Sequence, residues 1–472
     1  MTTSDIVQRM AAVVGPKGVL TGAADMAPYL VEQRGLYHGQ AAAILRPAST
    51  QEVSALLRIA HETGTLIVPQ GGNTGLVGGQ IPFDPAAIVV SLARMNRVRG
   101  LDALNNTLTV DAGVTLAQAQ QAAADADRLF PLSLASEGSC QIGGNLATNA
   151  GGTAVLRYGT ARDLVLGLEV VLADGRIWDG LTGLRKDNTG YDLKQLFIGS
   201  EGTLGIITGA VLKLFPAPRA TATAFAAVPD VAAAIALLRL AEETTGGRVS
   251  AFELMARIGL DFVIRHGADL RDPLAAPAPW YVLMELSAGT ADHALTDGLE
   301  ALLTKGHDAG LVIDATLAQT EAQARALWRL RETLPEAQRF EGGSIKHDIS
   351  VPVSAMPEFI ERASAAVAKA LPGVRPVPFG HAGDGNVHFN LSQPPGMESA
   401  AFLALWQDMN EIVHGIARDL GGSISAEHGI GVLKRDELAS LKAGVDIDLM
   451  RALKRTLDPK NILNPGKVIT LD

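Results

Sequence analysis

Apolar and polar positions in the first third of the chain alternate between the period of a strand and the period of a helix. Short apolar runs at 42–45 and 66–68 flank residues 53–60, where apolar side chains recur at helical spacing. We expect this helix to begin with a capping box at 49–52 and to end at Gly64. The pattern therefore predicts a β-α-β unit that leads directly into a glycine-rich loop.

Similar patterns continue toward the C-terminus. A proline-rich stretch at 215–218 is expected to close the first domain, and apolar runs at 280–286 and 311–317 predict strands beyond it. Residues 402–420 carry apolar side chains at helical spacing, which predicts one helix. Polar and apolar residues alternate strictly over 386–392, which predicts a strand whose apolar face enters a core.

The composition is that of a globular chain with two or three domains. It has 472 residues, 47% of them hydrophobic, and a net charge of −10, which disfavours a surface for nucleic acid or anionic membrane. Cys140 is the only cysteine, which excludes an intramolecular disulfide, a cysteine-based zinc site and an iron–sulfur cluster. Residues 1–14 show no secretory signal, and no long uncharged apolar run occurs. We therefore expect no transmembrane segment and a cytoplasmic location.

Glycine-rich loops at 69–79, 136–152 and 199–207 form the most informative pattern in the chain. They match neither a Walker A motif nor a Rossmann fingerprint. Consecutive backbone N–H groups in such loops form an anion-binding nest, and the missing Cβ atoms let a diphosphate approach closely. One loop alone is equally well explained as a plain connection. Three together favour a large ligand held mainly by backbone, such as a dinucleotide.

These loops, together with 186–193, resemble the FAD-binding domain of vanillyl-alcohol-oxidase-type (PCMH-type) flavoproteins. More narrowly, they resemble the branch of D-2-hydroxyglutarate and D-lactate dehydrogenases. The resemblance implies an α+β fold with an FAD-binding domain over 1–217, whose core begins at about residue 38. It further implies an α+β substrate (cap) domain with an antiparallel sheet over 218–420, and a C-terminal segment, 421–472, that returns to the flavin domain. The residues it assigns to FAD binding are Gly71, Gly72, Asn73, Thr74, Gly75, Leu76, Ser136, Ser139, Gly143, Gly144, Asn145, Thr148, Asn149, Gly151, Gly152, Glu201, Gly202, Ile206, Ile207 and Asn464.

The FAD is expected to be bound non-covalently. Covalent attachment in this superfamily commonly uses a histidine near the first glycine-rich loop, or a His/Cys pair. Residues 70–79 contain no histidine, and we interpret Cys140 as a packed small residue.

A divalent metal site is predicted at His381, His388 and Glu427. Two histidines and one glutamate supply three ligands and leave a position open, as in catalytic metal sites. From the spacing alone, a solvated polar strand face explains His388 equally well. The same motifs occur in the D-2-hydroxyglutarate dehydrogenase family, where they resemble zinc ligands, so zinc is the expected ion.

The resemblance also assigns the residues that would contact substrate. Arg331 would hold the hydroxy-acid end, Lys346 would face a distal carboxylate, and His428 would act as general base. Asn390 is expected on the same strand face as His388, where its amide could donate to the distal group. Pro335 stands where some family members carry a hydroxyl residue, which leaves the preferred chain length open.

The resulting hypothesis is an FAD-dependent, metal-assisted dehydrogenase, with Arg331 and His428 as its catalytic residues. It would oxidise a D-2-hydroxy acid to the 2-oxo acid by hydride transfer to flavin N5, with D-2-hydroxyglutarate favoured over D-malate or D-lactate. Electrons would leave to a separate acceptor, such as a flavoprotein carrier or a quinone, and the family implies a homodimer. The alternative is a metal-dependent hydrolase that uses the same histidines and glutamate with an activated water.

Overall fold

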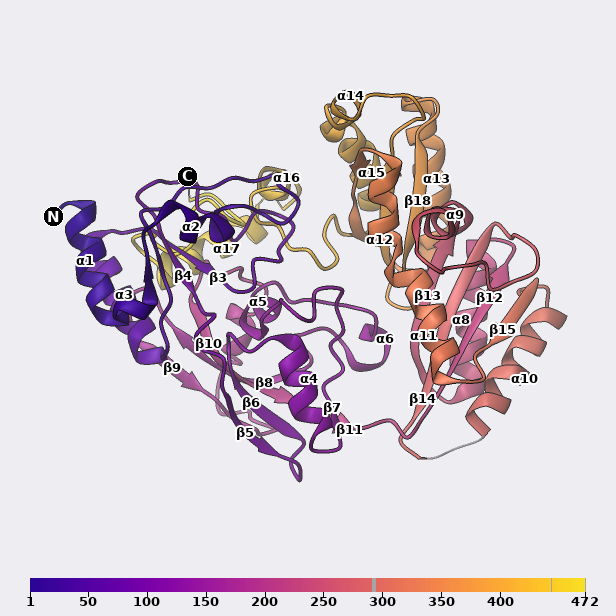
Figure 1. The fold of residues 1–472 in the computed structure, drawn as a ribbon, viewed down its shortest axis with the longest axis horizontal. Helices are drawn as coiled ribbons and strands as arrows, with labels where there is room; N and C mark the ends of the chain where they lie inside the picture. Colours follow the sequence, from indigo (N-terminus) through magenta and orange to yellow (C-terminus); the bar gives the residue numbers. More distant parts are fainter. Residues whose placement is uncertain (291–293, 443, 472) are drawn as a thin grey trace. The chain divides into compact units, whose positions relative to one another are not determined.

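The structure is a computed structural model that describes residues 1–290, 294–442 and 444–471. The chain forms two compact units (Figure 1). The first contains residues 1–151, 160–217 and 427–472, and the second contains 152–159 and 218–426. The second unit runs past residue 420 because residues 423–426 pair with it. Ser423 forms a β-bridge with Ser350, and the Ala426 N–H donates to the Asp348 carbonyl at 3.3 Å.

The first unit begins with a four-stranded sheet in the order β1-β2-β4-β3. β2 and β3 both run parallel to β4, as the predicted β-α-β unit requires, while β1 pairs antiparallel with β2. The segment after the last helix joins the edge at β3, where the Asn464 N–H donates to the Ile67 carbonyl at 2.7 Å. The elements here are α1 (Thr3–Val14), β1 (Val19–Leu20), α2 (Ala23–Leu30), β2 (Ala43–Leu45), α3 (Thr50–Thr63), β3 (Ile67–Gln70), β4 (Ile88–Ser91), α16 (Arg435–Leu441) and α17 (Val445–Leu457).

The helix α3 shows how local sequence sets an element. Ser49 accepts the Glu52 N–H at 3.2 Å, and Gly64 adopts the left-handed conformation that ends the helix. The predicted capping box is wrong in one half, because the Glu52 carboxylate accepts from the Ala48 N–H at 2.8 Å instead of from the Ser49 N–H. Glu52 thereby fixes the chain one residue before the cap.

A second, antiparallel sheet completes the first unit, in the order β5-β6-β10-β8-β9. Its central strand β10 is buried along nearly its whole length, which explains the apolar run that follows the third glycine-rich loop. The elements are β5 (Val98–Asp102), β6 (Thr107–Asp111), α4 (Leu116–Ala124), β7 (Arg128–Leu129), α5 (Ile142–Ala147), β8 (Val165–Val171), β9 (Ile177–Gly180), α7 (Lys194–Phe197), β10 (Ile206–Lys213) and β11 (Phe215–Pro216), which pairs with β7.

The second unit is built on one antiparallel sheet with helices on both faces (Figure 1). The strand order is β15-β12-β14-β13-β18-β19-β16, and β17 also pairs with β19. Alternate residues of β12 enter different cores: Ala224 belongs to the core that includes α8, α10, α13 and α15, and Phe225 belongs to the core that includes α9, α11 and α12. The elements are α6 (Val155–Tyr158), β12 (Ala220–Val228), α8 (Val231–Thr245), β13 (Val249–Ala256), α9 (Arg257–His266), β14 (Trp280–Ala288), α10 (Ala294–Asp308), β15 (Asp314–Leu317), α11 (Glu321–Glu332), α12 (Leu334–Ala337), β16 (Ser344–Ile345), β17 (Asp348–Ser350), α13 (Met356–Ala370), β18 (Arg375–His381), β19 (Asn386–Ser392), α14 (Ser399–Leu403) and α15 (Trp406–Asp419), with short 3₁₀ turns at Gln338–Glu341 and Val353–Ala355. The first unit has a further 3₁₀ turn at Pro16–Gly18.

Two predicted elements of this unit differ from the structure. The single helix expected over 402–420 is two helices, α14 and α15, because Leu405 leaves helical geometry and starts the second one. The strand expected over 311–317 begins only at Asp314. The strand predicted over 386–392 matches β19 in both bounds. No helix among the described residues is long and apolar enough to cross a bilayer.

Candidate functional site

The three glycine-rich loops converge within the first unit. A Cβ at Gly72 would lie 1.9 Å from the Ser139 carbonyl oxygen, so only glycine lets the first and second loops approach this closely. Gly202 in the third loop has φ +72°, and a Cβ there would lie 2.4 Å from the Pro69 ring. The Glu201 N–H donates to the Ala147 carbonyl at 2.8 Å, which joins the third loop to the second. Residues predicted to bind FAD in all three loops are therefore brought together.

Asn464 and Glu201 connect these loops to the C-terminal segment. The Asn464 amide donates to the carbonyls of Gly79 at 2.9 Å and Glu201 at 2.8 Å. The buried Glu201 carboxylate accepts the backbone N–H groups of Ile430 at 2.7 Å and Gly431 at 2.9 Å. Burial raises the pKa of Glu201, although these two donors oppose the rise. The predicted C-terminal contact, Asn464, thus lies against the first and third loops.

Lys467 adds a second buried charge to this region. Its ammonium group donates to the carbonyls of Gly78 at 3.1 Å and Ile81 at 2.5 Å, and it lies 4.4 Å from the centre of the Phe83 ring. Burial lowers the pKa of Lys467 to about 7, against the opposing attraction of Glu201. Lys467 therefore joins the C-terminal segment to the first loop.

The loops fit a bound dinucleotide because they keep acceptor groups unused. The buried side-chain oxygens of Gln70, Asn73, Gln141 and Asn464 have no hydrogen-bond partner among the described residues. Flavin and ribityl groups carry N–H and O–H donors that would satisfy such acceptors. Four of the residues predicted to bind FAD also have positive φ although they are not glycine, a strained geometry that clusters at binding sites: Asn73, Asn149, Glu201 and Asn464. One predicted residue, Gly152, belongs to the second unit.

The predicted histidines lie on neighbouring strands of the second unit. His388 is opposite Phe379 of β18 and opposite Asp348 of β17, and His381 ends β18. The imidazole rings of His381 and His388 have centres 5.6 Å apart. Both faces of β19 are largely buried. Its polar face, which carries His388, is therefore enclosed and is not the solvated face that the sequence also allows.

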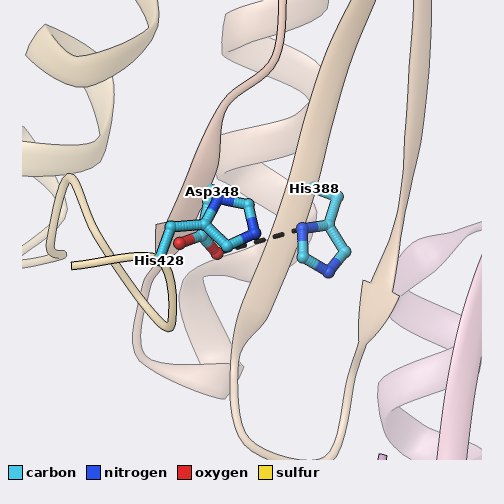
Figure 2. Close-up of side chains that lie close together, drawn as sticks. All are labelled: Asp348, His388 and His428. Atoms are coloured by element: carbon cyan, nitrogen blue, oxygen red, sulfur yellow. Dashed lines mark ion pairs between the residues drawn. The ribbon is translucent and has the colours of Figure 1, made fainter. Parts of the chain in front are cut away.

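Glu427 and His428 directly follow residues 423–426, which pair with β17. Two groups of possible metal ligands result: His381, His388 and Glu427 form one, and Asp348, His388 and His428 form the other. In each group the ligand atoms lie within 4.8 Å of one another. Figure 2 shows Asp348, His388 and His428 close together, with 3.9 Å between the Asp348 carboxylate and His388 Nδ1.

The donor set fits a divalent metal. Imidazole nitrogen and carboxylate oxygen atoms are ligands that zinc accepts, and three protein ligands leave a position for substrate. His388 is common to both groups, whereas Asp348 is an additional candidate that the sequence did not single out. Asp348 also accepts the Asn386 amide at 3.0 Å, which fixes the orientation of its carboxylate.

Arg331, on α11, reaches the same part of the sheet. Its Nε donates to Glu253 Oε2 at 2.7 Å, and its guanidinium lies 4.8 Å from the centre of the Phe379 ring. The other Glu253 oxygen lies 2.6 Å from His381 Nδ1. Burial alone would raise the pKa of Glu253, but His381 and Arg331 outweigh it and hold this pKa at about 2. One buried carboxylate therefore joins a predicted substrate residue to a predicted metal ligand.

Three residues are expected at the distal end of the substrate: Lys346, Asn390 and Pro335. Lys346 is half-buried in the turn between β16 and β17. The Asn390 amide, expected to donate to substrate, donates to Gln338 Oε1 at 2.9 Å, so one of its two hydrogens is already used. Pro335 occupies the first turn of α12, where its missing N–H costs nothing.

Sequence reasoning missed Glu253, Gln338 and Asp348. Glu253 is the one charged residue in the strand Val249–Ala256, and a lone acid in a buried strand indicates a paired charge. Its partners lie 78 and 128 residues away, so the sequence does not name them.

Two family models match this chain. Residues 41–180 match the family described as "FAD binding domain", and residues 217–468 match "FAD linked oxidases, C-terminal domain". The structure also superposes on p-cresol methylhydroxylase with a TM-score of 0.78 at 17% identity, covering 99% of this chain and 97% of that one. An alkyldihydroxyacetonephosphate synthase gives a TM-score of 0.76 at 19% identity, covering 98% and 86%. These structures confirm the predicted α+β flavoprotein fold.

Sequence relatives are much closer. The mitochondrial D-2-hydroxyglutarate dehydrogenase of Bos taurus is 41% identical over 97% of this chain and 82% of its own length. The D-2-hydroxyglutarate dehydrogenase of Xanthomonas citri pv. viticola is 40% identical over 90% and 89%. A D-2-hydroxyglutarate–pyruvate transhydrogenase of Saccharomyces cerevisiae is 38% identical over 92% and 87%. The predicted family is thereby confirmed, and this chain belongs to the FAD-linked oxidoreductases of the vanillyl-alcohol-oxidase type, in the branch that contains the D-2-hydroxyglutarate dehydrogenases.

Proposed function

We propose that this FAD-linked enzyme oxidises a D-2-hydroxy acid to the 2-oxo acid, with D-2-hydroxyglutarate as the favoured substrate. The observation that carries the proposal is the shared carboxylate of Glu253, which joins Arg331 to His381. A guanidinium suits bidentate binding of the substrate carboxylate, and a metal beside it suits the neighbouring hydroxyl. The names of the bovine and bacterial relatives support the same substrate class.

Three side chains of the protein would bind and orient the acid. Arg331 would hold the C1 carboxylate with its terminal nitrogens, because its Nε is occupied by Glu253. Lys346 would attract the distal carboxylate as a point charge. His428, as neutral imidazole, would accept the proton of the C2 hydroxyl.

The bound groups supply what side chains lack. FAD would supply the two-electron acceptor, taking the C2 hydride at N5. Zinc or a related ion held by His381, His388 and Glu427 would supply Lewis acidity toward the hydroxyl and carboxylate oxygens.

We propose that reducing equivalents then leave to a separate carrier and that the enzyme is a homodimer. The bovine relative is named mitochondrial, so a cytoplasmic location stays a prediction. The hydrolase alternative leaves the flavin-binding family match without a role.

A panel of D- and L-2-hydroxy acids with an artificial electron acceptor tests the proposal. We expect bleaching of the flavin by D-acids alone and the highest kcat/KM for D-2-hydroxyglutarate. If no D-2-hydroxy acid reduces the flavin under anaerobic conditions, the proposal is wrong.

A further inference from the structure

We propose that Glu253 is a positioning residue that uses one carboxylate to fix both the metal-facing nitrogen of His381 and the guanidinium of Arg331. This inference rests on the proposed function, since it takes His381 as a metal ligand and Arg331 as the substrate-binding cation. It adds a dependence between them: metal binding and substrate binding require the same buried group.

The geometry of Glu253 leaves little freedom. Glu253 pairs with His381 in the register of β13 and β18, and its side chain is buried, with 1% of the residue exposed. Oε1 lies 2.6 Å from His381 Nδ1, and Oε2 lies 2.7 Å from Arg331 Nε. An arginine Nε only donates, and an ionised carboxylate only accepts, so His381 Nδ1 must carry the hydrogen. In the neutral imidazole that can bind a metal, the lone pair is then on Nε2.

Arg331 is fixed in two ways. Glu253 takes its Nε, and the Phe379 ring lies under its guanidinium, with 4.8 Å from the central carbon to the ring centre. Together these contacts set the plane of the guanidinium. The structure gives its terminal nitrogens no hydrogen bond with any described residue, so both can turn to one carboxylate in the bidentate geometry that arginine favours.

Loss of the Glu253 charge should therefore have two separate effects. His381 would exchange an ionised acceptor for a weaker, neutral one, which lowers the basicity of its metal-facing nitrogen, and loss of such a partner typically weakens metal affinity 10–100-fold. Arg331 would lose its counter-charge and its fixed plane, which should raise KM. A residue that only filled space in the strand would produce neither effect.

Zinc affinity of the FAD-loaded enzyme, measured by competition with a chromophoric chelator, provides the direct test. Glu253→Gln keeps the shape of the side chain, and we expect roughly 10–100-fold weaker zinc binding. Arg331→Met should raise KM and leave zinc affinity unchanged, because Glu253 still holds His381. The matched control is Glu285→Gln on the adjacent strand β14, whose carboxylate accepts from Ser250 and Trp328 instead. It should leave both quantities unchanged.

The double variant Glu253→Gln/Arg331→Met guards against a folding artefact, because it removes both buried charges together. Its zinc affinity should stay as weak as that of Glu253→Gln. Three outcomes would each overturn the inference. They are a wild-type zinc affinity in a folded Glu253→Gln enzyme, a recovered zinc affinity in the double variant, and a loss of zinc affinity in Glu285→Gln as large as that in Glu253→Gln. Zinc binding is measured without substrate, so a failure of the proposed oxidation would be recognised separately.

Discussion

At the scale of single residues, Lys346 is the group expected to distinguish dicarboxylates from shorter acids. Lys346→Met should lower kcat/KM for D-2-hydroxyglutarate and D-malate far more than for D-lactate, by about 1.5–3 kcal/mol, because a charged hydrogen bond to the distal carboxylate is lost. Pro335 offers no donor at this end, so D-malate should compete with the longer acid. Lys369→Met, an exposed change on α13, is the control. An equal loss for all three substrates would show that Lys346 does not contact the distal group.

His428 is the residue whose removal separates proton transfer from metal binding. If it is the general base, His428→Ala should lower kcat roughly 10²–10⁴-fold and leave the zinc content unchanged. His428 also belongs to one of the two possible ligand groups, with Asp348 and His388. Zinc analysis of the purified variant therefore decides between the two roles, since loss of the metal would identify His428 as a ligand. The exposed His38→Ala serves as the control.

At the scale of elements, Glu341 holds the turn after α12 to α9 and β18. Its carboxylate accepts from Arg265 at 2.6 Å and Arg375 at 2.5 Å, and lies 2.7 Å from His266 Nε2. Burial alone would raise the pKa of Glu341, but these three partners outweigh burial and lower this pKa to about 2. The folded pKa is thus below the ordinary value of 4.5, so the stability from this group is present above pH 4.5 and is lost as the pH falls toward 2.

Glu341→Gln should therefore destabilise the enzyme at pH 7 by about 2 kcal/mol, the value of a charged hydrogen bond, and by much less at pH 3. Urea unfolding of the variant and the wild type at both pH values measures the difference. Glu336→Gln, an exposed change on α12, should have little effect at either pH. A Glu341→Gln deficit that is equally large at pH 3 would show that the charge is not responsible.

Elements with local determinants were predictable from the sequence. The helix α3 has its cap and its terminal glycine within the chain segment itself, and the strict alternation of β19 gave both of its bounds. The break between α14 and α15 was not predictable, because the apolar period continues through Leu405. Periodicity reports which face is buried, and it does not report a single residue that leaves helical geometry.

The candidate site was predictable only as far as its motifs are contiguous. The glycine-rich loops and the two histidines are read directly from short segments, whereas Glu253 acquires its role from strand pairing between β13 and β18. Asn390 is predicted to contact substrate because it shares a strand face with His388, but the sequence does not show that its amide meets Gln338, 52 residues away on another element. Long-range register decides which buried polar groups meet, and a single sequence contains little information about register.

At the scale of the whole molecule, the metal and the flavin should be separable. The residues predicted to bind FAD do not include any member of the two possible ligand groups. Prolonged chelation should therefore abolish turnover while the visible flavin spectrum is retained, and added zinc should restore activity. His388→Ala should mimic chelation whichever ligand group holds the metal, because His388 belongs to both. Near-native kcat/KM in the metal-free enzyme and in His388→Ala would show that this group of ligands has a structural role and is not needed for turnover.

The flavin itself should be released by denaturation, because the first loop has no histidine and the cysteine of the second loop is buried. Residues 70–79 contain no histidine, and Cys140 is only 2% exposed. Burial raises the pKa of the Cys140 thiol, and the Asn145 amide donates to its sulfur at 3.6 Å, so this cysteine is packed and in its unreactive protonated form. Acid precipitation should leave a yellow supernatant, with FAD and protein in equal amounts by absorbance and mass. Free FAD added to the same precipitation gives the recovery expected for unbound cofactor. Yellow colour that stays in the washed pellet would show a covalent bond and would direct attention to a residue outside these loops.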